Sequence, residues 1–209
     1  MFGVKGTCNM PVDINLLPEI VPFNNYGKWD VYMDELYKIF KQDFIDSKPH
    51  VGHVVFRLKF HPAFQDRAYT FYHMTHKGKI ESERKPDLRR SERLPWCRVT
   101  IEKTSPYHLC FWEEERKGHH RVCIWLQAED DNNNVAIENN YFVILEVRED
   151  YVLPWTAFCA EYNNQIRKKT KEYEQWLNNV DNRAYTLEEL INDIMNREKQ
   201  GSHENHTTP

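Results

Sequence analysis

The densest group of side chains capable of chemistry lies in residues 86–96, Pro-Asp-Leu-Arg-Arg-Ser-Glu-Arg-Leu-Pro-Trp. Guanidinium groups bind phosphate oxygens through two parallel hydrogen bonds, which the point charge of lysine cannot do. A tryptophan beside them offers a face on which a base can stack. Alternatively, the carboxylates neutralise the arginines, and the block is a clamp that ties a loop to a sheet. Both interpretations concern the same side chains: Arg89, Arg90, Arg93, Asp87, Glu92 and Trp96.

Two further residues have side chains suited to a reaction at phosphate. His73 stands in the aromatic run Thr70-Phe-Tyr-His73, and histidine is the side chain that best transfers protons near neutral pH. Packing in the core is its alternative role. Thr156 is the polar residue of a mostly apolar stretch, and its hydroxyl can bond a phosphate oxygen or its own sheet. Because no histidine, cysteine and carboxylate spacing resembles a metal site, we expect neither metal nor cofactor.

Composition limits the class of protein that can carry these residues. The chain has 209 residues, 40% of them hydrophobic, which is ample for a packed core. Seven glycines and the absence of GxGxxG and GxxxxGK[ST] argue against a Rossmann or P-loop protein. The net charge of −4 means that nucleic acid binding would need a local basic patch.

The cysteines and the hydropathy bear on location. Five cysteines, odd in number and irregularly spaced, are most simply reduced thiols in a cytoplasmic protein. No apolar run approaches about 18 residues and no signal peptide precedes the fold, so we expect no membrane association.

The N-terminal half is irregular. Residues 1–28 contain three prolines and no clear period, which predicts an extended arm lying on the domain. A helix is predicted from Asp30 to Ser47, with its apolar stripe at Val31, Leu36, Ile39, Phe40 and Phe44. Alternation over residues 53–60 predicts a strand. Residues 69–76 fit either a strand or a short helix, and residues 77–88 fit a charged loop.

The second half gives the clearer signal, a run of strands from 107 to 158. We expect a four-stranded antiparallel sheet with strands at 107–113, 120–127, 141–148 and 151–158, the last pair joined as a hairpin. Pro154 has no N–H to donate, so the last strand should lie at an edge or carry a bulge there. A helix over 159–180 is expected to pack on this sheet, with a stripe that ends at Val180.

Together these elements predict an α+β fold with a C-terminal helix on the sheet. The expected organisation is an arm (1–28), one α+β domain (29–180), a short C-terminal helix (181–200) and a disordered tail (201–209). Thr186 and Glu189 form a capping box for the last helix.

Several segments, in this order, resemble a known family, the phage and prophage proteins grouped as barnase-EndoU-colicin-RelE-like (BECR fold) nucleases. The resemblance covers roughly residues 35–175. It implies one or two N-terminal helices against a four-stranded antiparallel sheet, and RNA cleavage without metal through attack by the 2′-hydroxyl. The segments that carry it are Thr70-Phe-Tyr-His73, the block 86–96, Arg121-Val-Cys-Ile-Trp-Leu126, Tyr141-Phe-Val-Ile-Leu145 and Tyr151-Val-Leu-Pro-Trp-Thr-Ala-Phe158.

The resemblance also implies roles for individual residues. His73 would be the general base or acid, Arg93 would act at the phosphate with Glu92 orienting an arginine, and Thr156 would donate to a non-bridging oxygen. Further phosphate contacts would come from Arg89, Arg90 and Lys117, and Trp96 would stack on a base. The chain departs from the family pattern at two positions, having Ser91 in place of cysteine and Phe158 in place of tyrosine.

Two classes of function follow. The first is a metal-independent endoribonuclease, toxin-like or a phage host-takeover factor, with RNA as its partner and an antitoxin or another protein as a second one. The second is a non-catalytic binding or inhibitor protein that holds a protein partner through an exposed apolar patch. Binding of nucleic acid without cleavage is a third option.

Overall fold

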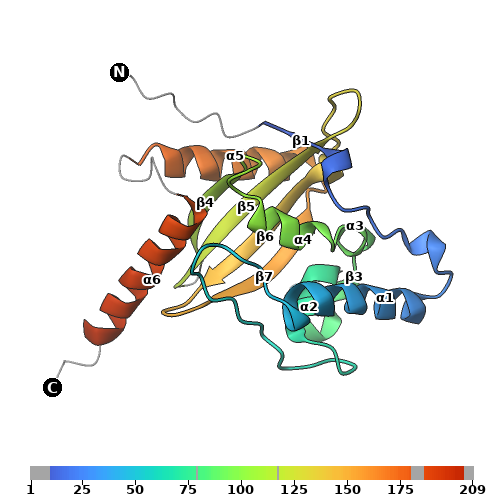
Figure 1. Ribbon diagram of the computed structural model, residues 1–209, viewed down its shortest axis with the longest axis horizontal. Coiled ribbons are helices and arrows are strands. Elements are labelled where there is room, and N and C mark those ends of the chain that lie inside the picture. The colour runs from blue at the N-terminus through green and yellow to red at the C-terminus, as the bar shows by residue number, and fades with distance from the viewer. Residues whose placement is uncertain (1–9, 79, 117, 180–185, 205–209) are drawn as a thin grey trace.

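The protein, as a computed structural model, is an α+β structure built around one mixed sheet (Figure 1). The structure describes residues 10–78, 80–116, 118–179 and 186–204. Four long strands lie in the order in which they follow one another in the chain: β4 (Cys110–Arg116), β5 (His119–Glu129), β6 (Asn140–Val147) and β7 (Val152–Cys159). Each pairs with the next in antiparallel fashion. The four strands predicted between residues 107 and 158 are therefore confirmed, although the first one begins and ends three residues later than predicted.

The N-terminal arm adds a fifth strand that the sequence did not reveal. Strand β1 (Val12–Asp13) pairs in parallel with the end of β5, with Val12 opposite Ala128. The prediction of a purely antiparallel, four-stranded sheet is wrong in this respect. Two residues are too few to show a strand period, so only the burial of Val12 against the core explains the pairing.

The two faces of the sheet bury separate apolar clusters. Helices α1 (Trp29–Lys41), α2 (Tyr69–Thr75), α4 (Trp96–Glu102) and α6 (Leu187–Glu204) share one cluster with the face that carries Val122, Ile124 and Val143. Figure 1 shows α4 crossing in front of the strands on this face. Helix α5 (Asn163–Leu177) packs through Tyr173 on the other face, which carries Trp112, Cys123 and Phe142.

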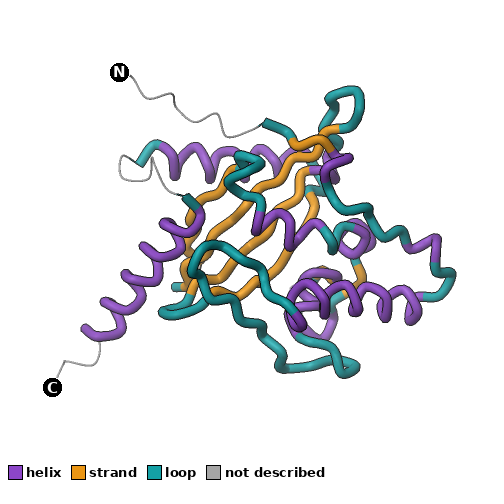
Figure 2. Tube along the Cα trace, viewed as in Figure 1, coloured by secondary structure: helices purple, strands orange, loops and turns teal. Residues whose placement is uncertain are grey.

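Residues 53–60 were predicted as a strand, and this prediction is wrong. They belong to a long loop between α1 and α2 (Figure 2). The loop touches the edge of the sheet at one bridge, where Arg57 N donates to Val152 O at 2.9 Å and Val152 N donates to Val55 O at 2.8 Å. The ladder cannot continue along β7, because Pro154 has no N–H to donate. As the sequence predicted, β7 lies at an edge, and its register shifts opposite Ile144 and Leu145.

The first predicted helix is present, but its buried face and its C-terminal end differ from the prediction. Helix α1 buries Tyr32, Met33, Leu36 and Phe40, and the chain continues as a π-helix to Asp46. Val31, assigned to the buried stripe, is 47% exposed. Residues 69–75 are helical, and residues 76–77 pair as β2 (His76–Lys77) with β3 (Lys85–Pro86). Helix α3 (Leu88–Glu92) forms within the polar block.

The C-terminal segment contains the predicted capping box. Thr186 N donates to Glu189 Oε2 at 2.8 Å, and Glu189 N donates to Thr186 Oγ1 at 3.2 Å. Helix α6 then runs to Glu204, into the range predicted as a disordered tail. Helix α5 is shorter than predicted, and Val180 lies outside the described residues. No helix within the described ranges is long and apolar enough to cross a membrane.

Candidate functional site: a basic groove on the sheet

The polar block 86–96 largely satisfies its own charges. Asp87 caps α3 by accepting from Arg90 N at 3.4 Å, and its carboxylate lies 3.3 Å from Arg90 Nε. Arg90 also donates to His76 O at 3.3 Å, which ties α3 to β2. Asp87 is buried, so this pair is poorly accessible to an RNA phosphate. For Arg90 the geometry is that of the clamp.

Arg93 and Trp96 are likewise held inside the protein. Arg93 is 8% exposed and donates from Nη2 to Asn139 Oδ1 at 3.0 Å, with its guanidinium 5.1 Å from the centre of the Trp96 ring. Trp96 is 1% exposed, and its Nε1 donates to Pro18 O at 2.9 Å. A ring this buried has no face for a base, so the expected stacking role of Trp96 is corrected to a core role.

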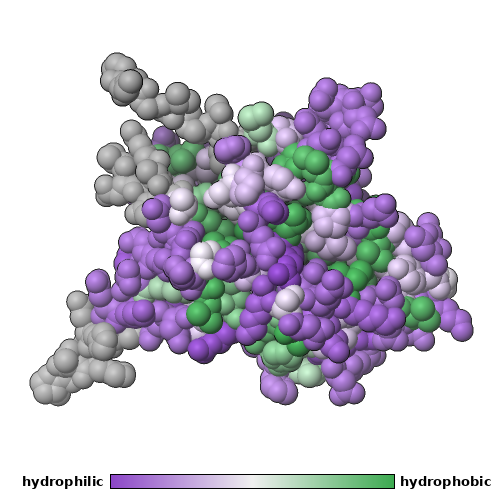
Figure 3. Space-filling view, in the orientation of Figure 1, coloured by the Kyte–Doolittle hydropathy of each residue, from purple (hydrophilic) through white to green (hydrophobic). Residues whose placement is uncertain are grey.

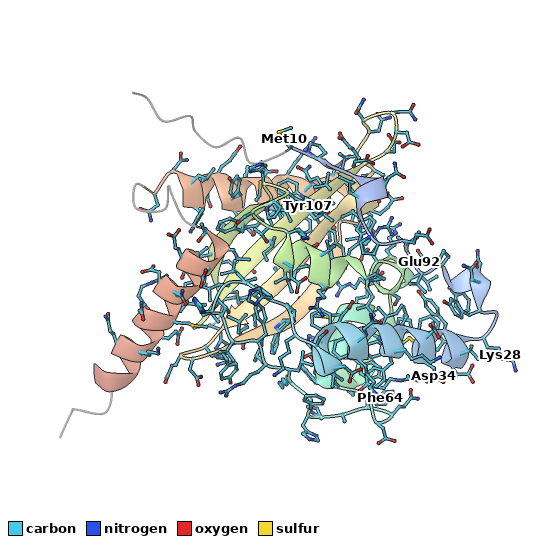
Figure 4. All side chains as sticks on the ribbon, in the orientation of Figure 1. Met10, Lys28, Asp34, Phe64, Glu92 and Tyr107 are labelled. Carbon is cyan, nitrogen blue, oxygen red and sulfur yellow. The ribbon has the colours of Figure 1, made fainter. Side chains whose placement is uncertain are left out.

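The remaining residues of the block lie nearer the surface. Arg89 is exposed, and its carbonyl accepts from Cys159 Sγ at 3.4 Å. Glu92 is half-buried at the end of α3 (Figure 4), and its carbonyl accepts from Val21 N at 2.8 Å. Lys117 lies outside the described residues.

His73 and Thr156 do meet, but not as a reacting pair. Thr156 Oγ1 donates to the backbone carbonyl of His73 at 2.6 Å. The imidazole is 5% exposed and lies between the rings of Tyr69 and Trp155, with centroids at 4.3 and 5.3 Å. The hydroxyl of Thr156 is thus used inside the fold, and the imidazole has almost no accessible surface.

The surroundings of His73 keep its ring neutral near pH 7. Burial, followed by the positive charge of Arg84, lowers the pKa of His73 to about 4, although Glu81 opposes the shift. Its Nε2 lies 3.0 Å from Glu81 Oε2, so the neutral ring donates its Nε2–H to that carboxylate. Arg93 instead packs with Trp96 on Tyr141, which belongs to the opposite face of the sheet from Trp155. The regions of His73 and Arg93 therefore do not converge on one cleft.

A different part of the structure does gather positive charge around an open cavity. We call it the basic groove; its volume is about 510 Å³. It lies where β5 begins, β6 ends and β7 begins, and the loop residues 57–59 form its other side. Its lining residues are Arg57, Leu58, Lys59, His119, Arg121, Glu146, Arg148, Tyr151, Leu153 and Trp155.

The central feature of the basic groove is a buried carboxylate that holds two arginines. Glu146 is 1% exposed, and its Oε2 accepts from Arg121 Nε at 3.2 Å and from Nη2 at 2.7 Å. Its Oε1 accepts from Arg148 Nη2. The β5–β6 register places Arg121 opposite Glu146, so the pair is fixed by the sheet itself. Two guanidinium groups and one carboxylate leave a net positive charge that faces the cavity.

Lys59 adds a further positive charge to the groove, and aromatic rings contact its cations. Lys59 Nζ lies 4.1 Å from the centre of the Tyr69 ring and 5.3 Å from that of Trp155. The Arg121 guanidinium lies 5.0 Å from the Trp155 ring, so this indole contacts cations from two segments. Arg57 pairs with Asp150 at 3.3 Å, but both side chains are more than half exposed, which makes the pair weak.

One histidine stands at the rim. His119 is exposed at the start of β5, and its Nδ1 lies 3.5 Å from Arg148 Nη1. An exposed imidazole beside a cationic groove is placed to exchange protons with a bound molecule.

Sequence reasoning missed this groove, although two signals pointed to it. Glu146 is the one charged residue in the strand Asn140–Val147, where every neighbour is neutral. A carboxylate in such a strand requires a partner of opposite charge. Arg121 lies on the face of β5 with Cys123 and Trp125, which the alternation alone shows.

Within the described part of the chain, no three histidine, cysteine, aspartate or glutamate side chains come together as a metal site. No protein family model, curated protein or solved structure matches this chain.

Proposed function

We propose that the protein is a metal-independent endoribonuclease that binds single-stranded RNA in the basic groove. The observation that carries the proposal is the buried Glu146, which holds Arg121 and Arg148 side by side at an open cavity. Guanidinium groups fixed in advance bind the phosphate oxygens and stabilise the charge that develops on them during reaction. The aromatic side chains beside them suit unstacked bases, which only single strands present.

The proposed reaction is an internal transfer at phosphorus. The 2′-oxygen loses its proton to a base and attacks the adjacent phosphorus, and the bond from phosphorus to the 5′-oxygen breaks. An acid protonates the departing 5′-oxygen, which leaves a 2′,3′-cyclic phosphate on one product. DNA lacks the 2′-hydroxyl and would not react.

His119 is the proposed proton-transfer residue and Glu146 the proposed positioning residue. Glu146 is 1% exposed and accepts three hydrogen bonds from Arg121 and Arg148, so it holds the two guanidinium groups in place without touching substrate. His119 at the rim would protonate the 5′-oxygen, while water takes the proton of the 2′-hydroxyl. Lys59 would add a contact to a neighbouring phosphate. This assignment moves the acid–base role away from His73 and the role of orienting arginines from Glu92 to Glu146.

The test is RNA cleavage in the presence of EDTA. We expect wild-type protein to cut single-stranded RNA, to leave 2′,3′-cyclic phosphate ends detectable by mass spectrometry, and to spare DNA of the same sequence. His119→Ala should lower the rate about 100-fold or more, as loss of a general acid does. His53→Ala replaces an exposed histidine outside the groove and should leave the rate unchanged. Absence of cleavage at high protein concentration, or equal loss in both variants, would overturn the proposal.

One observation favours binding of RNA without cleavage. Glu146 is 1% exposed and bonded to two arginines, so this carboxylate is not available as a base for the 2′-hydroxyl. In that case RNA would bind with the same dependence on Arg121, and no product would form. The alternative of a protein partner expects one exposed apolar patch. On the face shown in Figure 3, apolar side chains instead form separate patches on a largely hydrophilic surface.

A further inference from the structure

A second cavity is lined by Tyr69, whose ring contacts Lys59 and Trp155 of the basic groove. We call it the aromatic pocket; its volume is about 320 Å³. Its lining is mainly apolar and includes the rings of Phe64, Tyr69 and Tyr72. Sites for small ligands measure about 300–1,000 Å³, so the aromatic pocket lies at the lower end of this range.

The outer wall of the aromatic pocket is an exposed ring on a fixed loop. Phe64 is 60% exposed and meets the Tyr72 ring edge-on at 5.2 Å between centroids. Phe64 and Arg67 exchange two backbone hydrogen bonds, of 3.2 and 3.0 Å, which close a tight turn. Arg67 in turn pairs with Asp34 of α1 at 2.5 Å. Figure 4 shows Phe64 and Asp34 at the same corner of the molecule. The wall is therefore held in place before any ligand arrives.

Polar groups line one edge of this apolar pocket. Glu81 contributes a carboxylate that is about half exposed, and Arg84 contributes a guanidinium whose Nη1 lies 3.7 Å from Glu81 Oε1. Arg84 is held by donating from Nη2 to His76 O at 2.8 Å. An acceptor next to a donor, at the edge of a pocket with an exposed aromatic ring, matches the edge of a base and one of its faces.

The aromatic pocket adjoins the basic groove through shared residues. Tyr69 lines the pocket, and Lys59 of the groove stands over the Tyr69 ring at 4.1 Å. The Tyr69 ring is 6.1 Å from that of Trp155, which lines the groove. The contacts of Tyr69 with Lys59 and Trp155 thus join the aromatic pocket to the basic groove.

We propose that the aromatic pocket binds one base of the RNA strand whose phosphates lie in the basic groove. This inference rests on the proposed function and extends it. The groove binds phosphates of any strand, whereas the pocket would add affinity only where the strand carries a base. Phe64 supplies the stacking surface, Tyr69 and Tyr72 line the pocket beside it, and Glu81 and Arg84 contact the edge of the base.

The test compares two RNA strands that cannot be cleaved because every sugar is 2′-O-methylated. One strand carries all its bases, and the other has the same length and charge but lacks bases. We expect Phe64→Ala to weaken binding of the first strand about tenfold, within the range that loss of a base–aromatic stack produces, and to leave the second unchanged. Phe60→Ala removes an exposed ring outside the pocket and should change neither.

The outcomes separate this inference from the proposed function. Equal effects of Phe64→Ala on both strands, or no effect on either, would overturn the aromatic pocket as a base site while cleavage by wild-type protein stands. Arg121→Ala should weaken both strands alike, since the groove binds phosphate. If wild-type protein binds neither strand, the proposed function and this inference both fall. A folded Phe64→Ala variant is verified by its circular dichroism spectrum.

Discussion

The carboxylate of Glu146 accepts a hydrogen bond from Arg121 Nη2 at 2.7 Å across the β5–β6 ladder, in a strand whose residues are all buried. Removing two charges from water costs several kcal/mol per ion, and well-packed apolar residues often do as well or better for stability. Packing alone therefore gives no reason to place this pair in the sheet. What the pair does provide is a guanidinium fixed in position at the basic groove.

The first prediction concerns the stability of this pair. Glu146→Ala leaves Arg121 and Arg148 without their shared carboxylate, so we expect the free energy of unfolding to fall by roughly 3–5 kcal/mol. Urea denaturation monitored by tryptophan fluorescence measures it. Glu115→Ala, at an exposed position on β4, should stay within about 0.5 kcal/mol of wild type. If Glu146→Ala lost no more stability than this control, Glu146 would not be a buried carboxylate paired with Arg121 and Arg148.

The second prediction concerns the salt dependence of RNA binding. Each phosphate neutralised on a single strand contributes about −0.7 to the slope of log K against log salt. Lys59→Ala should make the slope less steep by about that amount, because Lys59 lies in the groove beside Trp155. Fluorescence anisotropy with 2′-O-methylated RNA at several salt concentrations measures the slope.

Lys41→Ala serves as the matched control. Lys41 is exposed at the end of α1, outside the basic groove. Its replacement should leave the slope unchanged. If both lysines change it equally, the binding is spread over the surface and the groove is not its centre.

The strands of the sheet could be predicted because their signal is local. Strands β4 and β5 contain alternating stretches, β6 is a continuous apolar run broken only by Glu146, and the position of Pro154 is enough to predict an edge or a bulge in β7. Residues 53–60 alternate equally well, yet they remain a loop. Their state depends on whether the neighbouring edge can donate hydrogen bonds, which a pattern within the segment does not contain.

The site was harder to predict because its partners are distant in sequence. Arg93 reaches Asn139, 46 positions away, and His73 lies against Trp155. The sequence of residues 86–96 contains the arginines. It does not contain the groups that accept their hydrogen bonds, such as the His76 carbonyl and the Asn139 amide. Glu146 was visible as an isolated charge in an apolar strand, and the question of its partner would have led to Arg121.

The third prediction concerns acid stability. Burial lowers the pKa of His73 to about 4, below the value of about 6.5 expected in the unfolded chain. Between pH 4 and pH 6.5 the His73 side chain is protonated in the unfolded chain and neutral in the folded protein. The contribution of His73 is thus fully favourable above pH 6.5 and is lost as pH falls toward 4, by at most about 1.4 kcal/mol per pH unit.

His73→Gln should make the dependence of unfolding free energy on pH shallower over this window. Burial also lowers the pKa of His76 to about 4, so part of the slope will remain. His53→Gln changes an exposed histidine and should keep the wild-type slope. Urea denaturation at pH 7, 6 and 5 gives the three slopes. An unchanged slope in His73→Gln would show that this ring takes up its proton equally readily in both states.

The fourth prediction separates a structural role of Thr156 from a role at the phosphate. Its hydroxyl donates to His73 O at 2.6 Å and so joins β7 to the last turn of α2. Thr156→Val keeps the shape and the preference for a strand but removes this bond, so we expect a loss of about 1 kcal/mol in unfolding free energy. RNA cleavage, compared under conditions where both proteins are folded, should not change. Thr156→Ser retains a hydroxyl and should recover most of the stability. If Thr156→Val instead lowered cleavage about 100-fold, the scale of a lost catalytic group, and Thr156→Ser restored it, the hydroxyl would contact the substrate and not the helix.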